Sequence, residues 1–199
     1  MTEKQRFEHL LVVTSSKKFL ENKAYAQEIP FFICPYLATD ANKMNKLISN
    51  LVKKLKEKQI TVLHLNLYDT CLEILAEKKV LSWIIKNEAS KAKDQIKELL
   101  QNSLDIEKYV IPHIRKFTDK ADYDLIFVSG MGEVYPYIRA HNFLNNLQST
   151  IKSKPMLMFF PGDYTHSLEK GSVLELFGKL TDDRYYRAFD IFDIKAESL

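Results

Sequence analysis

The sequence predicts an α/β domain, with a mostly parallel sheet of four to five strands, flanking helices and a helical insertion between the second and third strands. Four short, mostly apolar runs carry this prediction, at residues 30–35, 60–67, 124–129 and 156–160. Runs of this length bounded by Pro, Gly or Asp are typical of strands buried on both faces of a parallel sheet. Helical periodicity fills the stretches between them, as a parallel α/β sheet requires.

The stretch between the first two strands predicts a helix with one apolar stripe and Asp40 as its N-cap. The stripe consists of Met44, Leu47, Ile48, Leu51, Val52 and Leu55. Lysines cover the remainder of this helix. An anion-binding face is one interpretation, but we favour a solvated face, because lysine stems cover apolar surface while their ammonium groups stay in water.

Residues 69–118 are helical in character, and they are far longer than the dozen or so residues that a crossover between parallel strands needs. We therefore predict a small helical insertion beside the sheet. The aromatic stretch from Tyr185 to Phe192 is a candidate edge strand. The predicted organisation is an N-terminal helical segment over residues 1–28, followed by a single α/β domain over residues 29–199.

Composition limits the possible functions. The chain has 199 residues, 46% of them hydrophobic and 28% charged, which is ordinary for one packed domain. A net charge of +3 is too small to indicate nucleic-acid binding unless the cations cluster. Cys34 and Cys71 lie in apolar segments without CxxC spacing, which is typical of free thiols in a reducing compartment. No apolar stretch is long enough to span a bilayer, so we expect a soluble, cytoplasmic protein.

The turns that follow the predicted strands are the first place to look for a ligand, because α/β sheets bind ligands outside the carboxyl ends of their strands. The candidate binding residues in these turns are Gly130, Gly132, Glu133 and Asp163. Gly130 and Gly132 form only part of a dinucleotide-binding motif, and no phosphate-binding GK[ST] sequence follows a strand. The sequence therefore argues against nucleotide hydrolysis and dinucleotide binding.

Catalytic and metal-binding patterns are equally incomplete. Ser129 lacks the glycine two positions earlier that a G-x-S-x-G nucleophile turn requires. The candidates His64, His141, Asp163 and His166 show no close metal-ligand spacing. We interpret His64, inside an apolar strand, as a hydrogen-bonded core histidine. We predict no catalytic set, no metal site and no cofactor.

Two polar segments remain as candidate binding surfaces. A helix expected to begin near Tyr135 would bury a stripe of Tyr137, Ala140, Leu144, Leu147 and Ile151. Arg139, Asn142 and Asn146 would then lie on its opposite face, with His141, Asn145 and Gln148 along the border of the stripe. This face is either a ligand or partner surface or a polar border beneath neighbouring loops.

The second polar segment mixes carboxylates, arginines and a tyrosine, namely Asp182, Asp183, Arg184, Tyr185 and Arg187. Tyr and Arg are enriched as anchors of protein interfaces. The same residues would equally protect an edge strand from aggregation by charge. Both interpretations stay open.

Five blocks of the sequence resemble the BrxB family of BREX (bacteriophage exclusion) defence systems. They are Phe32–Tyr36, Leu65–Asp69, Val134–Gln148, Phe159–Tyr164 and Leu176–Phe189. The resemblance runs in order from about Ile29 to Ile194. It implies a role in phage discrimination beside a DNA methyltransferase, a large ATPase and an alkaline-phosphatase-like protein of the PglZ type, and it implies no established enzymatic activity.

From this resemblance we expect a non-catalytic adaptor that binds other BREX proteins, first among them the PglZ-type component. The alternative is a nucleotide- or nucleic-acid-binding enzyme that uses the carboxyl ends of the strands. We expect no membrane association and no direct DNA contact.

Overall fold

The computed structural model describes residues 1–21, 31–151, 154–167, 171–182 and 188–195. Its centre is a parallel sheet with strand order β2-β3-β4-β1-β7. The strands are β1 (Phe31–Tyr36), β2 (Val62–Asn66), β3 (Leu125–Ser129), β4 (Met156–Ser167) and β7 (Phe189–Asp190). The four predicted strands and their parallel arrangement are confirmed, and β7 confirms a fifth strand at the edge of the sheet beside β1.

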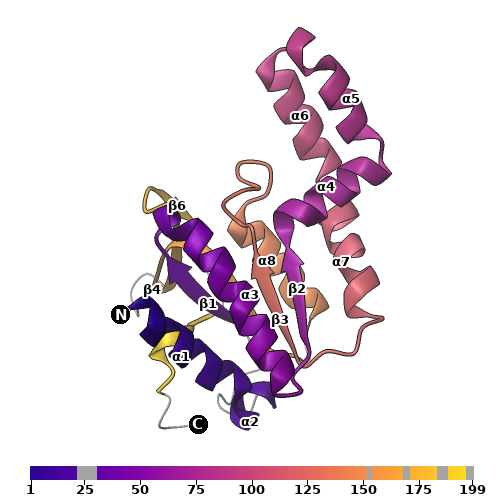
Figure 1. Cartoon of the computed structure of the whole chain (residues 1–199). Helices are drawn as coiled ribbons and strands as arrows, with labels where there is room; N and C mark the ends of the chain where they lie inside the picture. The colour runs from indigo at the N-terminus through magenta and orange to yellow at the C-terminus, as the bar shows by residue number, and fades with distance from the viewer. Residues whose placement is uncertain (22–30, 152–153, 168–170, 183–187, 196–199) are drawn as a thin grey trace.

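One face of the sheet is covered by α1 (Glu3–Ser15), α2 (Lys17–Leu20) and α3 (Ala41–Glu57) (Figure 1). The predicted stripe of α3 packs here, and all of it is buried except Val52, which is half-buried. Asp40 occupies the N-cap position as predicted. Its carboxylate accepts a hydrogen bond from Lys43 Nζ at 2.7 Å instead of capping a backbone amide.

The opposite face is covered by α4 (Leu67–Glu77), α7 (Ile111–Thr118) and α8 (Ala140–Thr150), with a turn of π-helix at Ile106–Val110 before α7. Between α4 and α7 lie α5 (Val80–Asn87) and α6 (Lys93–Ser103), which extend beyond the sheet at the top of Figure 1. The predicted helical insertion is confirmed. We call residues 78–103, which contain α5 and α6, the arm. Within the described ranges, no helix combines the length and the apolar character needed to cross a bilayer.

The turn predicted after the fourth strand is wrong. The chain continues as β4 through Ser167 and pairs antiparallel with β5 (Gly171–Leu176), which pairs in turn with β6 (Leu180–Asp182). Gly162 permits this close pairing, because a Cβ at that position would collide with the carbonyl oxygen of Glu175. The Pro-Gly pair therefore lies inside a strand. Of the expected edge strand, only residues 188–192 are among the described residues.

The helix expected from Tyr135 begins five residues later, at Ala140. Residues 131–138 form turns in which the Val134 carbonyl accepts from the amides of both Tyr137 and Ile138. Arg139 then has extended backbone angles (φ −100°, ψ 140°), which separate these turns from the helix. The proline in this segment accordingly belongs to a loop, and Arg139 is the N-cap residue of α8.

Candidate functional site

The carboxyl ends of β2 and β3 meet at Asn66 and Ser129, which are partners in the sheet register. Gly130 follows with a positive φ of 82°. A Cβ on Gly130 would lie 2.6 Å from Asn66 Oδ1, and this oxygen accepts hydrogen bonds from the amides of Tyr68 and Asp69 at the start of α4. Gly130 thus lets the chain pack against the N-cap of α4. The space in which a phosphate would approach the backbone is therefore already filled.

The other candidates from this turn have similar local roles. A Cβ on Gly132 would lie 2.8 Å from Pro161 Cγ and 2.9 Å from Phe177 Cε1, so this glycine accommodates the β4–β5 pair. Glu133 is exposed and lies near Tyr36 at the end of β1. Burial, with a smaller contribution from the Glu133 carboxylate, raises the pKa of Tyr36 to about 12. The Tyr36 hydroxyl therefore stays protonated at neutral pH.

His64 is exposed on the outermost strand of the sheet, which corrects its interpretation as a core histidine. Its Nε2 lies 2.8 Å from Ser129 Oγ. The sheet register pairs His64 with Phe127, and Ser129 shares the face of Phe127 because the two are two residues apart on β3. The side chains of His64 and Ser129 therefore lie on the same face of the sheet. Partial desolvation lowers the pKa of His64 despite the opposing charge of Asp69, which favours the neutral imidazole. Ser129 is only 3% exposed, so a substrate cannot readily reach its hydroxyl.

The polar side chains of α8 divide differently from the expectation. Arg139, Asn142 and Asn145 are exposed, and Asn146 is half-buried, with its side-chain amide donating to the Asn142 carbonyl at 2.9 Å. His141, predicted at the border of the buried stripe, is itself buried. It precedes Leu144 by three residues and shares the face that packs on the sheet. The solvent side of α8 is therefore narrower than the predicted polar face, and it begins at Arg139.

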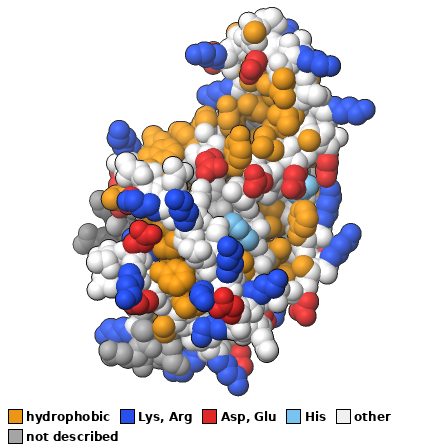
Figure 2. All heavy atoms as spheres, in the orientation of Figure 1, with side chains coloured by type: hydrophobic (Ala, Val, Ile, Leu, Met, Phe, Trp, Pro, Cys, Tyr) orange, Lys and Arg blue, Asp and Glu red, His pale blue; other side chains and the backbone are white. Residues whose placement is uncertain are grey.

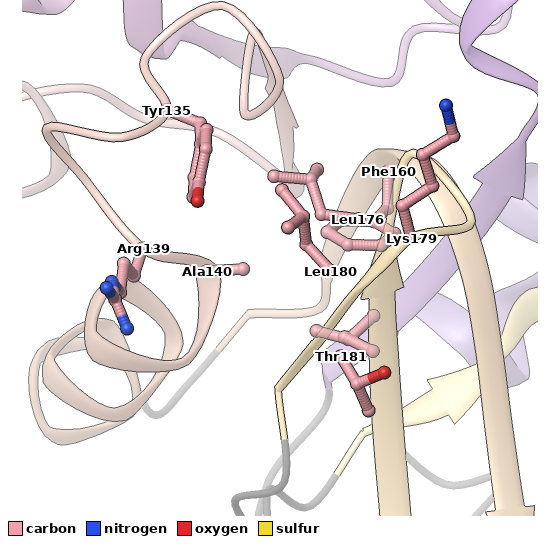
Figure 3. A pocket seen from close by; sticks show the side chains of 9 residues that line it. Tyr135, Arg139, Ala140, Phe160, Leu176, Lys179, Leu180 and Thr181 are labelled. Carbon is pink, nitrogen blue, oxygen red and sulfur yellow. The ribbon is translucent and has the colours of Figure 1, made fainter.

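A pocket of about 260 Å³ lies between the Tyr135–Ala140 segment and the β5–β6 hairpin (Figure 3). It is lined by Tyr135, Arg139, Ala140, Phe160, Leu174, Leu176, Lys179, Leu180 and Thr181. Among the predicted site residues, Arg139 lines it. Asp163 is exposed further along β4, the Asp182 side chain is not described, and Asp183, Arg184, Tyr185 and Arg187 lie outside the described residues.

The remaining lining residues were missed because the hairpin was missed. The signal was the alternation of leucine with polar residues at 174–176, followed by Gly178 and Leu180. That pattern is typical of two strands around a tight turn. Phe177 and Gly178 both have positive φ in this turn, and the Phe177 ring packs edge-on against Tyr135, with 6.4 Å between the ring centroids.

The arm is the second surface feature that the sequence patterns did not indicate. Trp83 is 42% exposed and Ile85 is 68% exposed, and both belong to the short helix α5. A shallow, mostly apolar depression of about 350 Å³ lies beside Trp83 and is lined by Lys78, Lys79, Val80, Trp83 and Leu99. Figure 2 shows hydrophobic side chains gathered over these projecting helices, with lysines around their outline.

Chemically reactive groups are scarce at these surfaces. The Cys34 and Cys71 thiols are free and buried, and burial raises the pKa of each to about 12, so both stay protonated. Among the described residues, no three His, Cys, Asp or Glu side chains are grouped closely enough to hold a metal ion. What the described surfaces offer is apolar contact, hydrogen bonding and positive charge.

Comparison with known proteins identifies the family. The family model described as BREX protein BrxB matches residues 63–191. This chain belongs to the BrxB family. A BREX protein BrxB of Bacillus cereus (strain H3081.97) is 34% identical over 191 residues, which cover 95% of this chain and 97% of that protein. A BREX protein BrxB of Escherichia coli O9:H4 (strain HS) is 28% identical over 172 residues, covering 86% and 82%. No solved structure matches the chain.

The resemblance predicted from the sequence is thus confirmed. The region matched by the BrxB model begins in β2 and ends after β7. It contains the whole arm, the ends of β2 and β3, and the pocket beside Arg139. Helices α1 and α3 lie outside it, although the BrxB relative from Bacillus cereus aligns over nearly the entire chain.

Proposed function

We propose that this member of the BrxB family is a cytoplasmic, non-catalytic adaptor of a BREX phage-defence system, and that it binds another protein of the system through its arm. The observation that carries the proposal is the exposure of Trp83 and Ile85 on helices that extend away from the sheet. Trp is among the residues most enriched at the energetic centres of protein interfaces.

The arm gains little stability from its own packing. Helix α5 has 8 residues and α6 has 11, and helices this short are marginal in water without tertiary contacts. Ile84 is the one buried apolar side chain in the two helices, while Val80, Leu81, Leu99 and Leu100 are half-buried. At its base, Lys78 Nζ lies 3.2 Å from the centroid of the Tyr109 ring and donates to the Ser103 carbonyl at 3.1 Å. A partner that covers Trp83 and Ile85 would supply the missing burial.

The charge of the arm supports one kind of partner surface. Residues 78–103 contain six lysines and three carboxylates, so this short segment carries as much net positive charge as the whole chain. A complementary surface would have an apolar centre and acidic residues around it. The PglZ-type protein is the partner we propose first, with the large ATPase and the DNA methyltransferase as the other system components to be tested.

Co-purification tests the proposal. The tagged chain is mixed at micromolar concentration with each purified system protein, and we expect at least one to be retained. Ile85→Glu should abolish that retention, because it replaces the most exposed large apolar side chain of the arm with a carboxylate. Val12→Glu is the matched control, since Val12 is also exposed, at 47%, but lies on α1. Failure of every component to bind, or equal binding by Ile85→Glu, would contradict the proposal.

The alternative, a nucleotide-binding enzyme at the ends of β2 and β3, has the contact between His64 and Ser129 in its favour. It predicts that a nucleotide or a divalent metal raises the melting temperature of the chain, since a ligand at 100 times its dissociation constant adds about 2.7 kcal/mol. His64→Gln should remove that shift. A panel of nucleotides and metals that leaves the melting temperature unchanged would dismiss this alternative.

A further inference from the structure

We propose that the pocket beside Arg139 is a second docking site, which takes an apolar side chain flanked by Asp or Glu in an extended segment of a partner protein. This inference rests on the proposed adaptor function, and it adds a surface separate from the arm. The pocket lies on the β5–β6 hairpin and the start of α8, whereas the arm is built from α5 and α6.

The size of the pocket favours an anchoring side chain. Its volume of about 260 Å³ is below the range of roughly 300–1,000 Å³ typical of pockets for cofactors and drug-sized ligands. A single large side chain needs less room than a nucleotide. The pocket therefore suits one anchor residue of a longer chain that continues across the surface.

The strand side of the pocket is apolar. Phe160, Leu174 and Leu176 are buried and form the strand side of the pocket. Leu180 is 40% exposed, which leaves an aliphatic side chain in contact with water beside the opening. An apolar anchor would cover Leu180 and remove its apolar surface from water, which favours binding.

Positive charge flanks this apolar lining. Arg139 and Lys179 lie on different segments, one before α8 and the other in the turn of the hairpin, as Figure 3 shows. Both are exposed, and neither forms an ion pair with a described residue. None of the nine described lining residues is Asp or Glu. This charge favours carboxylates on either side of the anchor, and Arg can bind one with two hydrogen bonds.

The hairpin also favours an extended partner over a helical one. Among the described strands, β6 pairs with β5 alone. A segment that adds to an edge strand forms backbone hydrogen bonds along it, while alternate side chains enter neighbouring pockets. Leu180 and Thr181 of β6 both line the pocket, so a strand added here would direct a side chain toward it.

Peptide binding to the full-length chain tests this inference. The probes are fluorescently labelled, overlapping peptides that cover the three other BREX proteins, and the measurement is fluorescence anisotropy. We expect the peptides that bind to share an apolar residue flanked by carboxylates. Arg139→Glu should weaken their binding at least tenfold, because it removes the charged hydrogen-bond donor and places a carboxylate beside the carboxylates of the peptide. Lys46→Glu, the same charge change on the exposed side of α3, should leave it unchanged.

Several results would overturn the inference. The inference fails if no peptide binds or if the peptides that bind are basic. It also fails if Arg139→Glu binds peptide as tightly as the original chain, or if ATP or inorganic phosphate displaces the peptide. Melting curves of both variants guard against unfolding. If whole partners are retained through the arm while no peptide binds, the second docking site fails and the adaptor proposal stands. If neither binds, both fail.

Discussion

The sheet and the arm contain similarly apolar stretches but bury them very differently. Strand β3 is buried along its whole length, with Ile126 and Val128 facing one set of helices and Phe127 facing the other. Helix α5 has an equally apolar run at residues 83–85, yet two of its three side chains are exposed. The hydrophobic pattern of a sequence thus states how much surface is available for burial. It does not state whether the chain itself or another protein covers that surface.

The strongest test of this contrast is a matched pair of isoleucine substitutions. Ile126→Ala removes a fully buried side chain from β3 and should lower the free energy of unfolding by about 2–5 kcal/mol. Ile85→Ala on the arm should change it by less than about 0.5 kcal/mol, because that side chain already contacts water. Urea denaturation of the isolated chain measures both. Similar losses for the two variants would mean that the arm is part of the core.

The next effect in size concerns the glycines with positive φ. Gly130→Ala should destabilise the chain by more than the roughly 1–2 kcal/mol that the left-handed conformation costs an alanine, because its Cβ would also meet Asn66. Gly178→Ala is the control, since its φ is similar but its nearest neighbour is Asp163 Oδ2 at 3.6 Å. Thermal melts compare the two, and equal losses would refute the close packing of Gly130 on the cap of α4.

The sequence predicted the sheet much better than the surfaces beside it. Strands such as 124–129 are short apolar runs whose burial on both faces follows from composition alone, so their parallel arrangement could be anticipated. The continuation of β4 past Pro161 and Gly162 could not, because both residues normally indicate a turn. The glycine serves instead for close contact with the backbone of Glu175, a residue distant in sequence.

The candidate site was harder to predict for the same reason. Arg139 was proposed from its helix face, but the pocket beside it depends on Leu174, Leu176 and Leu180 of a hairpin that local patterns did not indicate. The exposure of Trp83 was equally invisible, because its spacing in α5 fits a buried stripe as well as an exposed one. Local sequence patterns indicate most helices and strands, whereas a binding surface depends on which helices and strands meet in the fold.

Substitutions on the solvent side of α8 should have a smaller effect on stability and a large effect on phage protection. Arg139→Ala combined with Asn146→Ala removes an exposed guanidinium and a half-buried amide that donates to Asn142. The free energy of unfolding should change by about 1 kcal/mol or less. Phage protection in a plaque assay of the whole defence system should be lost, because the pocket loses its arginine. Full protection with an unchanged melt would remove this surface from the functional account.

The smallest expected effect is the contribution of His64 to the pH dependence of stability. It sharpens the contrast between the sheet and the arm, because His64 lies at the edge of the sheet. Desolvation by the sheet lowers the pKa of His64 below its ordinary value of 6.5, so the unfolded chain binds a proton more readily than the folded one. The stability of the chain should therefore fall as the pH is lowered through 6.5 toward the folded pKa. Above pH 6.5 the contribution of neutral His64 to stability should be fully present. His64→Gln can still hydrogen-bond to Ser129 but does not titrate. The difference in melting temperature between pH 7.5 and pH 5.5 should accordingly be smaller in His64→Gln than in the original chain. An equal or larger difference in the variant would mean that His64 is solvated like an ordinary surface histidine.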